Sequence, residues 1–402
     1  MLETDIAIVG AGAAGLSLAH RLAAGPAAGV SVALLAPPPG PLRAPRRTWC
    51  FWEPVPGRYD RAVAASWEWL RVRDRHGAAV RRHIAPLRYK MIRSGDFEHL
   101  VGEELGACPA VRRVEAAVDT VTVLPDRTAL LLATDGSGAR LPVRARWVFD
   151  SRPPTALPAA RTHLLQHFRG WFVHAQHPVF DPETVELMDF RTPQPARGLS
   201  FGYVLPTGPR TALVEYTEFG PAPLTREAYD AALHHYTRHV LGTGEVRVLA
   251  TETGVIPMTD APPVRQAAGP VFRIGTAGGA TRASTGYTFA AIQRQTDAVA
   301  DAVRAGRRPL PPAPHPARAR MMDAVLLGAL ATGRVDGADL FFHLFRRVPA
   351  RRLLRFLDGR TRLAEDLAVG VRTPVLPMLR TAAELPWLPR RPAPVPPPGV
   401  RR

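Results

Sequence analysis

One acidic side chain stands in an unusual place. The stretch TALVEYTEF, residues 211–219, alternates like a β-strand, and Glu215 lies in its middle between apolar neighbours. By the two-residue period of a strand, Glu215 shares a face with Leu213 and Thr217. Glu218 faces the other side. A carboxyl group in apolar surroundings has a raised pKa and can donate a proton near neutral pH, whereas the alternative is a strand glutamate that faces solvent or pairs with an arginine.

A second polar pair occurs in the stretch LMDFR. Asp189 and Arg191 are two residues apart on a predicted strand, so their side chains share a face. Such a pair could orient a proton donor or a bound cofactor, and we include both residues with Glu215 as candidate catalytic groups. A purely structural ion pair is the alternative. Glu252, which precedes TGVIPM, is a weaker candidate of the same kind.

The chain opens with a phosphate-binding pattern. Gly10, Gly12 and Gly15 form the spacing G-x-G-x-x-G between a short apolar strand and a helix. The first glycine allows a tight turn, the second lets a pyrophosphate approach the backbone, and the third lets helix and strand pack closely. With Ala13 and Ala14, these residues would offer backbone N–H groups at a helix N-terminus to the phosphates. The pattern predicts a dinucleotide cofactor.

The sugar end of this predicted site departs from the usual pattern. An acidic residue commonly ends the second strand and binds the ribose. Here that position lies near Ala36, where the sequence is LLAPPP. We therefore expect the ribose to be held by main-chain groups or by Arg46 or Arg47.

A second glycine-rich turn occurs in the stretch RIGTAGGATRASTGYTF, after a predicted strand and before a predicted helix. Backbone N–H groups at such a turn could bind a flavin's phosphate or stabilise negative charge on a reduced flavin ring. An ordinary helix cap with flexible glycines is the alternative. The candidate cofactor-binding residues here are Gly275, Gly278, Gly279, Thr285, Gly286 and Tyr287.

The elements around these residues indicate an α/β protein with a discontinuous cofactor domain. A β-α-β pattern opens the chain, and residues 1–160 form the first part of this domain, with about 50–90 contributing to the substrate side. Residues 161–255 are predicted to form an antiparallel substrate-binding sheet. Residues 256–310 supply the second part of the cofactor domain, and 311–402 form a helical region with a Pro/Arg-rich tail.

The chain is strongly basic, with a formal net charge of +17 in which Lys90 is the only lysine. Such a field favours anionic partners. Because zinc-finger spacing and RNP-type aromatic runs are missing from the sequence, we expect no nucleic-acid partner and expect attraction to an anionic membrane surface. The stretch 339–358 combines Leu and Phe with arginine pairs. It suits a helix lying on such a surface, or one packed on the body with solvated arginines.

The cysteines and histidines of the chain indicate its cellular location and whether it holds a metal ion. With only Cys50 and Cys108, the default is a reducing, cytoplasmic location. No apolar run of 18 residues is free of charge and the N-terminus has no basic lead-in, so we expect a peripheral contact with the membrane. No metal is expected, because no carboxylate lies at useful spacing from His163, His167, His174 and His177.

Nine segments occur in one order over residues 5–295: GAGAAG, RRTWCFWE, YKMIRSGDFE, VFDSRP, LLQHFRGWFV, MDFR, LVEYTEF, GVIPM and GGATRASTGYTF. Together they resemble the bacterial lycopene cyclase family of carotenoid biosynthesis. The resemblance implies a Rossmann-like FAD-binding flavoprotein of the glutathione-reductase/hydroxylase type, with an antiparallel substrate sheet and C-terminal helices. Thr276 departs from many flavin enzymes, which carry an aspartate there.

The resemblance also implies an acid-catalysed, redox-neutral reaction. The ψ-ends of lycopene would close to β-rings, giving γ-carotene and β-carotene, with reduced FAD placing negative charge where the carbocation develops. NADPH would serve only to keep FAD reduced. The family's acidic motif F-L-E-E-T matches LVEYT, with Glu215 at its first glutamate and Tyr216 in place of the second.

Two other hypotheses remain open at this point. A flavin monooxygenase or a polyprenyl reductase on the same scaffold would use the flavin's electrons stoichiometrically and would not need Glu215. A non-catalytic carotenoid- or flavin-binding protein would keep its cofactor after Glu215→Gln. The number of ends cyclised, the ring type and the oligomeric state are left undetermined.

Overall fold

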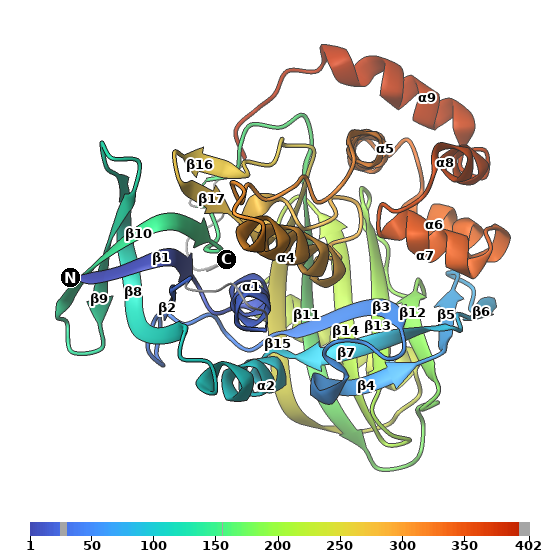
Figure 1. Cartoon of the computed structure of the whole chain (residues 1–402). Helices are drawn as coiled ribbons and strands as arrows, with labels where there is room; N and C mark the ends of the chain where they lie inside the picture. The colour runs from blue at the N-terminus through green and yellow to red at the C-terminus, as the bar shows by residue number, and fades with distance from the viewer. Residues whose placement is uncertain (25–29, 155, 394–402) are drawn as a thin grey trace.

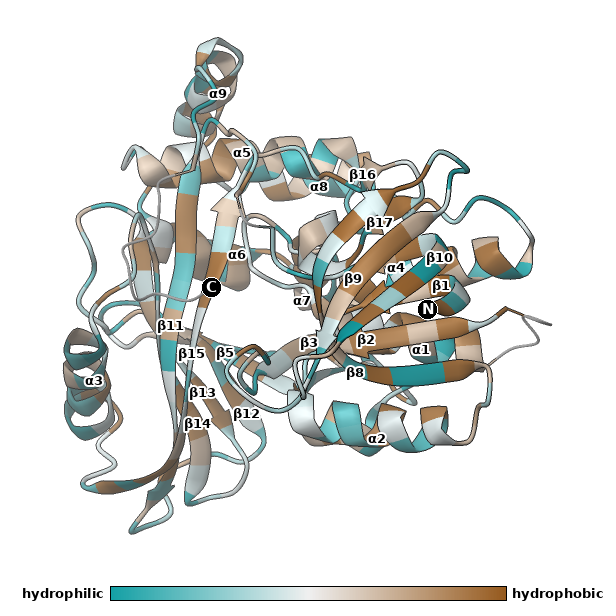
Figure 2. Ribbon diagram, turned by 90° about the vertical axis from the view of Figure 1, so that its left-hand side faces the viewer, coloured by the Kyte–Doolittle hydropathy of each residue, from teal (hydrophilic) through white to brown (hydrophobic). Residues whose placement is uncertain are grey.

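The computed structural model describes residues 1–24, 30–154 and 156–393. Two large sheets stand side by side in it, with helices above them (Figures 1 and 2). The first sheet runs in the order β1-β2-β8-β9-β10-β17-β16, and β1 also pairs with β10. Its strands are β1 (Leu2–Val9), β2 (Val32–Ala36), β8 (Val111–Val123), β9 (Ala129–Asp135), β10 (Arg140–Asp150), β16 (Gln266–Ala268) and β17 (Val271–Arg273).

The centre of the first sheet is parallel and carries helices on one face. β1 pairs in parallel with β2 and β10, and β17 pairs in parallel with β10. Helices α1 (Ala13–Ala23), α2 (Ser94–Gly106) and α4 (Phe289–Arg304) share one apolar core with β1 and β2. Strands buried on both faces need near-continuous apolar sequence, which β1 and β2 supply at their buried ends. The predicted Rossmann-like flavoprotein fold is confirmed.

The second sheet is mostly antiparallel, in the order β15-β11-β14-β13-β12-β5-β6. Helix α3 (Arg226–His235) covers its outer face, as Figure 2 shows, and a π-helical turn (Tyr236–Val240) extends that helix. The inner face is turned toward the site. The strands are β5 (Trp69–Arg73), β6 (Ala79–His83), β11 (His163–Ala175), β12 (Thr184–Asp189), β13 (Leu199–Pro206), β14 (Thr211–Gly220) and β15 (Val246–Thr259).

A small sheet connects the two large ones. It consists of β3 (Thr48–Pro54), β4 (Val63–Trp67) and β7 (Leu87–Arg93), with β7 in the middle of its pairings. Phe51 and Ile92 belong to the core under α1 and α4, whereas Tyr89 and Met91 belong to the core of the second sheet. Alternate residues of one strand thus join both cores, so the cofactor half and the substrate half are held as one packed unit.

In the described residues five α-helices follow α4 and lie over the second sheet: α5 (Ala317–Ala331), α6 (Gly337–Arg347), α7 (Ala350–Leu357), α8 (Leu363–Gly370) and α9 (Val375–Glu384). The stretch 339–358 is divided between α6 and α7, because Pro349 has no N–H group to continue the first helix. Its apolar side chains, including Phe341 and Leu354, are buried in the core of the second sheet. This segment is therefore a packed helix pair, and the surface-helix alternative is not supported.

Candidate active site

The opening glycine turn has the shape that a phosphate site requires. Gly10 has φ of 98°, and a Cβ on Gly15 would lie 1.8 Å from the carbonyl oxygen of Gly10, so both positions need glycine. A Cβ on Gly12 would meet no atom within 4 Å, which leaves the approach to the backbone open. Helix α1 begins at Ala13 and has no acidic side chain in its first turn and no side-chain cap. Its N-terminal N–H groups are thus available to an anion.

The second glycine turn packs directly against the first. Gly275 has φ of 65°, and a Cβ there would lie 2.7 Å from the Cβ of Ala14. The turn itself, Gly275–Gly278, is a short 3-10 helix, and Gly279 ends it with φ of 82°. Helix α4 begins at Phe289, slightly later than the sequence suggested. The two turns therefore form one wall.

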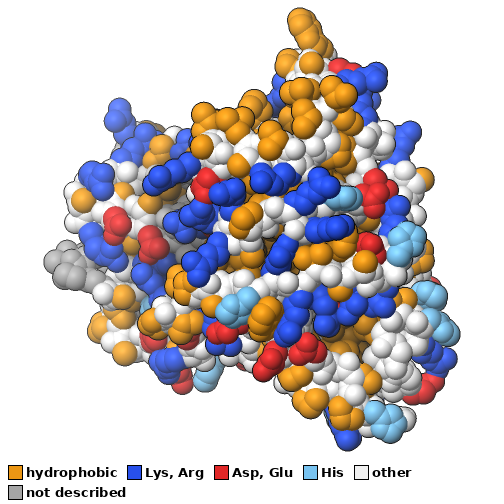
Figure 3. Space-filling view, turned by 90° about the vertical axis from the view of Figure 1, so that its right-hand side faces the viewer, with side chains coloured by type: hydrophobic (Ala, Val, Ile, Leu, Met, Phe, Trp, Pro, Cys, Tyr) orange, Lys and Arg blue, Asp and Glu red, His pale blue; other side chains and the backbone are white. Residues whose placement is uncertain are grey.

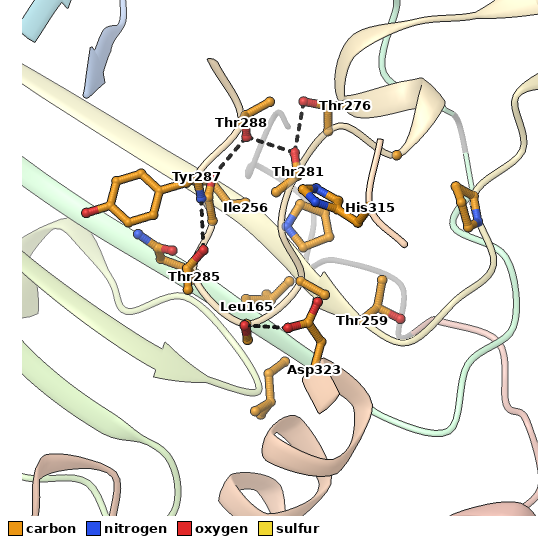
Figure 4. A pocket seen from close by; sticks show the side chains of 18 of the residues that line it. Leu165, Ile256, Thr259, Thr276, Thr281, Thr285, Tyr287, Thr288, His315 and Asp323 are labelled. Carbon is orange, nitrogen blue, oxygen red and sulfur yellow. Dashed lines mark hydrogen bonds between the residues drawn. The ribbon is translucent and has the colours of Figure 1, made fainter. Parts of the chain in front are cut away.

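Several threonine hydroxyl groups in and after this second turn line the site. Thr281 hydrogen-bonds to Thr276 at 3.2 Å and to Thr288 at 3.0 Å, as Figure 4 shows. Thr276 thus presents a hydroxyl where an aspartate was expected. Thr285, Gly286 and Tyr287 also line the site, and Gly286 has φ of 72°. These groups fit a polar, phosphate-bearing cofactor with hydroxyl groups along its chain.

The ribose end is built differently from the usual pattern. Ala36 and Arg46 line this end of the site, and Arg46 is exposed next to Gly95. A carboxylate is present after all, on Glu98 of α2, where it pairs with Arg43. The sequence could not place Glu98 here, because α2 is separated from the end of β2 by about 60 residues of chain.

A single cavity of about 1820 Å³ joins the glycine turns to the inner face of the second sheet and to the C-terminal helices. Its first part is lined by Gly10–Ala14 and by Gly275–Ala277, and its middle by side chains of β11, β13 and β14. At the far end it reaches Leu344, Phe345 and Leu379 of the C-terminal helices. A cavity of this length has room for a dinucleotide at one end and a long apolar molecule at the other.

Glu215 lies on the inner face of β14, in the middle part of this cavity. Its side chain is 7% exposed, and Thr217 Oγ1 donates a hydrogen bond to Glu215 Oε1 at 2.6 Å. Glu218 lies on the opposite face, as the strand period predicted, where it approaches His167 and Tyr216. Burial, followed by the nearby negative charge of Glu252, raises the pKa of Glu215 to about 8. The carboxyl group is thus mostly protonated at neutral pH and faces an apolar space.

Three tyrosines lie next to Glu215 and form what we call the tyrosine cluster: Tyr89 of β7, Tyr203 of β13 and Tyr287. The hydroxyl of Tyr89 hydrogen-bonds to that of Tyr203 at 2.7 Å and to that of Tyr287 at 3.0 Å. In the sheet register Tyr203 pairs with Glu215, so both side chains project to the same face. Burial raises the pKa of each phenol, which keeps the cluster neutral. Neutral aromatic rings beside a proton donor can stabilise a developing cation.

Asp189 and Arg191 lie elsewhere, so the sequence-based hypothesis that they act beside Glu215 is not supported. They pair with each other at 2.6 Å, and Tyr236 of the π-helical turn donates a hydrogen bond to Asp189 Oδ2 at 2.9 Å. Neither residue lines the cavity. Leu187 and Met188 of β12 line the cavity at a β-bulge, and Asp189 points away from it toward Tyr236. The pair is the structural ion pair that the sequence left as an alternative.

Sequence reasoning named Tyr287 as a candidate cofactor-binding residue but missed Tyr89, Tyr203 and Gly170. Tyr89 and Tyr203 lie more than 100 residues apart, and only the pairing of distant strands brings them together. Gly170 had a visible signal, because a glycine inside the aromatic strand FRGWFV indicates a close approach. Among the described residues, no group of three His, Cys, Asp or Glu side chains could hold a metal ion.

Comparison with solved structures shows the same fold at low sequence identity. The chain is similar to a geranylgeranyl bacteriochlorophyll reductase-like protein from Thermoplasma acidophilum, with a TM-score of 0.67, 14% identity, and coverage of 97% of this chain and 100% of that one. It is also similar to p-nitrophenol 4-monooxygenase from Pseudomonas putida, with a TM-score of 0.59, 15% identity, and coverage of 97% and 100%. A flavin-dependent brominase matches with a TM-score of 0.55, 15% identity, and coverage of 89% and 94%.

Sequence comparison identifies the family. No curated protein matches the chain significantly. The model of the family described as lycopene cyclase protein matches residues 5–383, which is nearly the whole chain. This match agrees with the ordered segments found in the sequence and with a flavoprotein fold that holds a protonated glutamate in an apolar cavity. The chain belongs to the lycopene cyclase protein family.

Proposed function

We propose that this protein converts the ψ-ends of lycopene to β-rings by acid catalysis without net oxidation or reduction. The observation that carries the proposal is the buried carboxyl group of Glu215 in a long apolar cavity, where burial raises its pKa to about 8. Protonating a carbon–carbon double bond requires a proton donor that stays protonated until substrate arrives, and burial provides this. Membership of the family supports a cyclase-type reaction on a carotenoid.

The proton of Glu215 is transferred to C2 of the ψ-end and leaves a tertiary cation at C1. The electron pair of the C5–C6 double bond then forms the C1–C6 bond, which moves the positive charge to C5. Loss of the C6 proton restores a C5–C6 double bond and completes the β-ring. The product is an isomer of the substrate. Tyr203 and the apolar walls exclude water, which would otherwise capture the cation.

FAD fits the cofactor end of the cavity. Gly10, Gly12 and the start of α1 would bind its pyrophosphate, and the second turn with Thr276 would bind groups nearer the flavin ring. When bound and reduced, FAD supplies negative charge in a site of low dielectric constant, where a charge acts strongly on a nearby cation. NADPH is proposed only as the electron donor that keeps it reduced.

The apolar end of the cavity supports uptake of the substrate from a membrane. Six exposed apolar side chains, 43–69% exposed, surround this end: Met321, Leu363, Leu367, Val371, Val375 and Leu379. In Figure 3 hydrophobic side chains gather at the top of the face that carries the C-terminal helices, above a band of Lys and Arg. No helix in the described parts of the chain is long and apolar enough to cross a bilayer. We propose a peripheral, cytoplasmic contact with an anionic membrane.

An anaerobic electron count tests the reaction. Protein in liposomes that contain lycopene receives enough dithionite to reduce its FAD once, and products are followed by chromatography and mass spectrometry. Many product molecules of unchanged mass per flavin are expected. One product per flavin, or a mass change of hydrogen or oxygen, would contradict the proposal and favour the polyprenyl reductase or the monooxygenase.

Variants of the acid complete this test. Glu215→Gln should lower the rate at least about 100-fold, the usual contribution of a positioned proton donor. Glu218→Gln, on the other face of the same strand, is the matched control and should stay near the wild-type rate. Retention of full activity by Glu215→Gln would exclude it as the acid.

A further inference from the structure

Two glutamates, one buried and one half-buried, lie in one row across three strands of the second sheet. Gly170 of β11 pairs with Glu215 of β14 on one side and with Glu252 of β15 on the other. Residues paired directly across antiparallel strands project to the same face, so both carboxyl groups lie on the cavity side. Because Gly170 has no side chain, the two groups approach each other over it. A Cβ atom at Gly170 would lie 2.9 Å from Leu213 Cδ1, 3.4 Å from Glu252 Cγ and 3.6 Å from Glu215 Oε2.

The two carboxyl groups have different surroundings. Burial raises the pKa of both, and at Glu215 the negative charge of Glu252 raises it further. At Glu252 several groups act in the opposite direction. Thr48 Oγ1 donates a hydrogen bond to Glu252 Oε2 at 2.7 Å, and the charges of Arg47 and Arg93 favour the carboxylate. Negative charge is therefore held more readily on Glu252, and the proton on Glu215.

The two carboxyl groups are the ones that titrate at this place, because the neighbouring thiol and phenol groups stay neutral. Two carboxylates in one apolar site resist double ionisation, so the pair retains one proton over a wide pH range. Burial raises the pKa of Cys50 to about 12 and also raises that of each phenol in the tyrosine cluster, so these groups stay neutral. The titratable and charged groups that face the pair are Cys50, Tyr89, Tyr203, Tyr287, Arg47 and Arg93.

We propose that Glu252 is the base that removes the C6 proton, and that this proton returns to Glu215 across Gly170. The inference rests on the proposed cyclisation. Glu215 gives its proton to C2 and becomes a carboxylate, and Glu252 accepts the proton from C6 while the C–H electron pair forms the new C5–C6 double bond. Transfer of that proton from Glu252 to Glu215, directly or through one water, restores the starting state. No oxidant, reductant or net proton is consumed.

Replacement of the base tests this assignment. Glu252→Gln should lower β-ring formation at least about 100-fold, and the residual product should contain ε- or γ-rings, because the C5 cation must then lose a proton from C4 or from its methyl group. Glu252→Asp, which keeps the carboxyl group, should restore β-rings in part. Glu218→Gln is the control for removing a carboxyl group from the same sheet. Thermal unfolding and FAD absorbance check that each variant folds and binds its cofactor.

A second measurement does not depend on turnover. The infrared carbonyl band of a protonated carboxyl group, assigned to Glu215 by its loss in Glu215→Gln, is titrated in the wild type and in Glu252→Gln. The band should disappear at lower pH in Glu252→Gln, because the neighbouring negative charge that favours the protonated form is gone.

The outcomes separate the two proposals. If the wild type cyclises lycopene but Glu252→Gln forms β-rings within about twofold of its rate and leaves the titration unchanged, the base assignment is wrong and the cyclase stands. If the wild type forms no cyclic isomer, the proposed function fails and the base role fails with it. In that case a shifted carbonyl titration would still show that the two carboxyl groups interact.

Discussion

At the scale of single residues, the site separates a group that holds a proton from a group that holds a charge. Glu215 and Glu252 are the same residue type, on the two strands that flank β11, with Glu215 buried and Glu252 half-buried. Only Glu252 has positive side chains nearby. Environment alone therefore assigns the two roles, as in other paired-carboxyl sites.

The pH dependence of the reaction follows from Glu215. Its pKa of about 8 lies above the ordinary value of 4.5, so the protonated donor is present at neutral pH and is lost as pH rises through about 8. The single-turnover rate should be nearly flat from pH 6 to 7 and fall about tenfold for each unit well above pH 8. A pH–rate profile of the reduced enzyme measures this, and a rate that rises between pH 7 and 9 would contradict it.

The same shift affects stability. Between the ordinary pKa of 4.5 and about 8, the unfolded chain releases the Glu215 proton while the folded protein keeps it, so the free energy of unfolding decreases with rising pH in this window. Glu215→Gln should lack this part of the decrease, as urea unfolding at several pH values would show.

At the scale of elements, glycines decide where strands and helices can meet. Gly202 of β13 lies under Tyr236, which joins the outer face of the sheet to Asp189. Gly170 gives the same kind of space on the inner face, where the side chains of Leu213, Glu215 and Glu252 come close to it. Gly202 thus makes room for a structural contact on the outer face of the sheet, and Gly170 makes room on the inner face next to the two carboxyl groups.

Gly202→Ala should destabilise the protein without touching the cavity. Its Cβ would lie 2.1 Å from Tyr236 Cζ, and relieving such an overlap in a packed region costs about 1–3 kcal/mol. Gly106→Ala is the control, since a Cβ at the end of α2 meets no atom within 4 Å. Thermal unfolding of both variants measures the difference, and equal midpoints would contradict the packing argument.

The sequence predicted some parts of this architecture well and others poorly, for physical reasons. The strand period placed Glu215 and Glu218 on opposite faces, because that period is a property of the backbone. It could not tell which side of β12 faces the cavity, and a β-bulge there interrupts the period, so the catalytic and structural alternatives for Asp189 stayed open. The tyrosine cluster and the approach of Glu252 depend on the register between distant strands, which no local pattern records.

At the scale of the whole molecule, one cavity links a polar cofactor end to an apolar rim on the C-terminal helices. The apolar residues of α6 and α7 are used mainly for the core, whereas Leu363 and Leu367 of α8 and Val375, Leu376 and Leu379 of α9 remain exposed. Exposed apolar surface of this extent, with basic side chains nearby, is typical of a surface that contacts lipid.

Membrane binding should depend on α9 and the turn after it. Leu376 is 80% exposed and Trp387 is 87% exposed. The double variant Leu376→Ser/Trp387→Ser should reduce binding to anionic vesicles at least about tenfold, because each buried apolar side chain contributes about 1.5–3 kcal/mol. Leu249→Ser, at a residue 54% exposed on β15, is the matched control. Equal flotation of all three proteins with vesicles would contradict this docking surface.

Because the chain has one lysine, arginine determines how its basic surface would respond to pH and salt. Lys90 is buried, with Glu53 and Asp60 as partners, so the basic surface consists of arginine guanidinium groups. These groups keep their charge at every pH at which the protein stays folded. Adhesion to an anionic bilayer would therefore vary with salt and lipid composition but not with alkalinity. With the proposed membrane contact unchanged, a loss of turnover in mild base would report on the interior carboxyl groups.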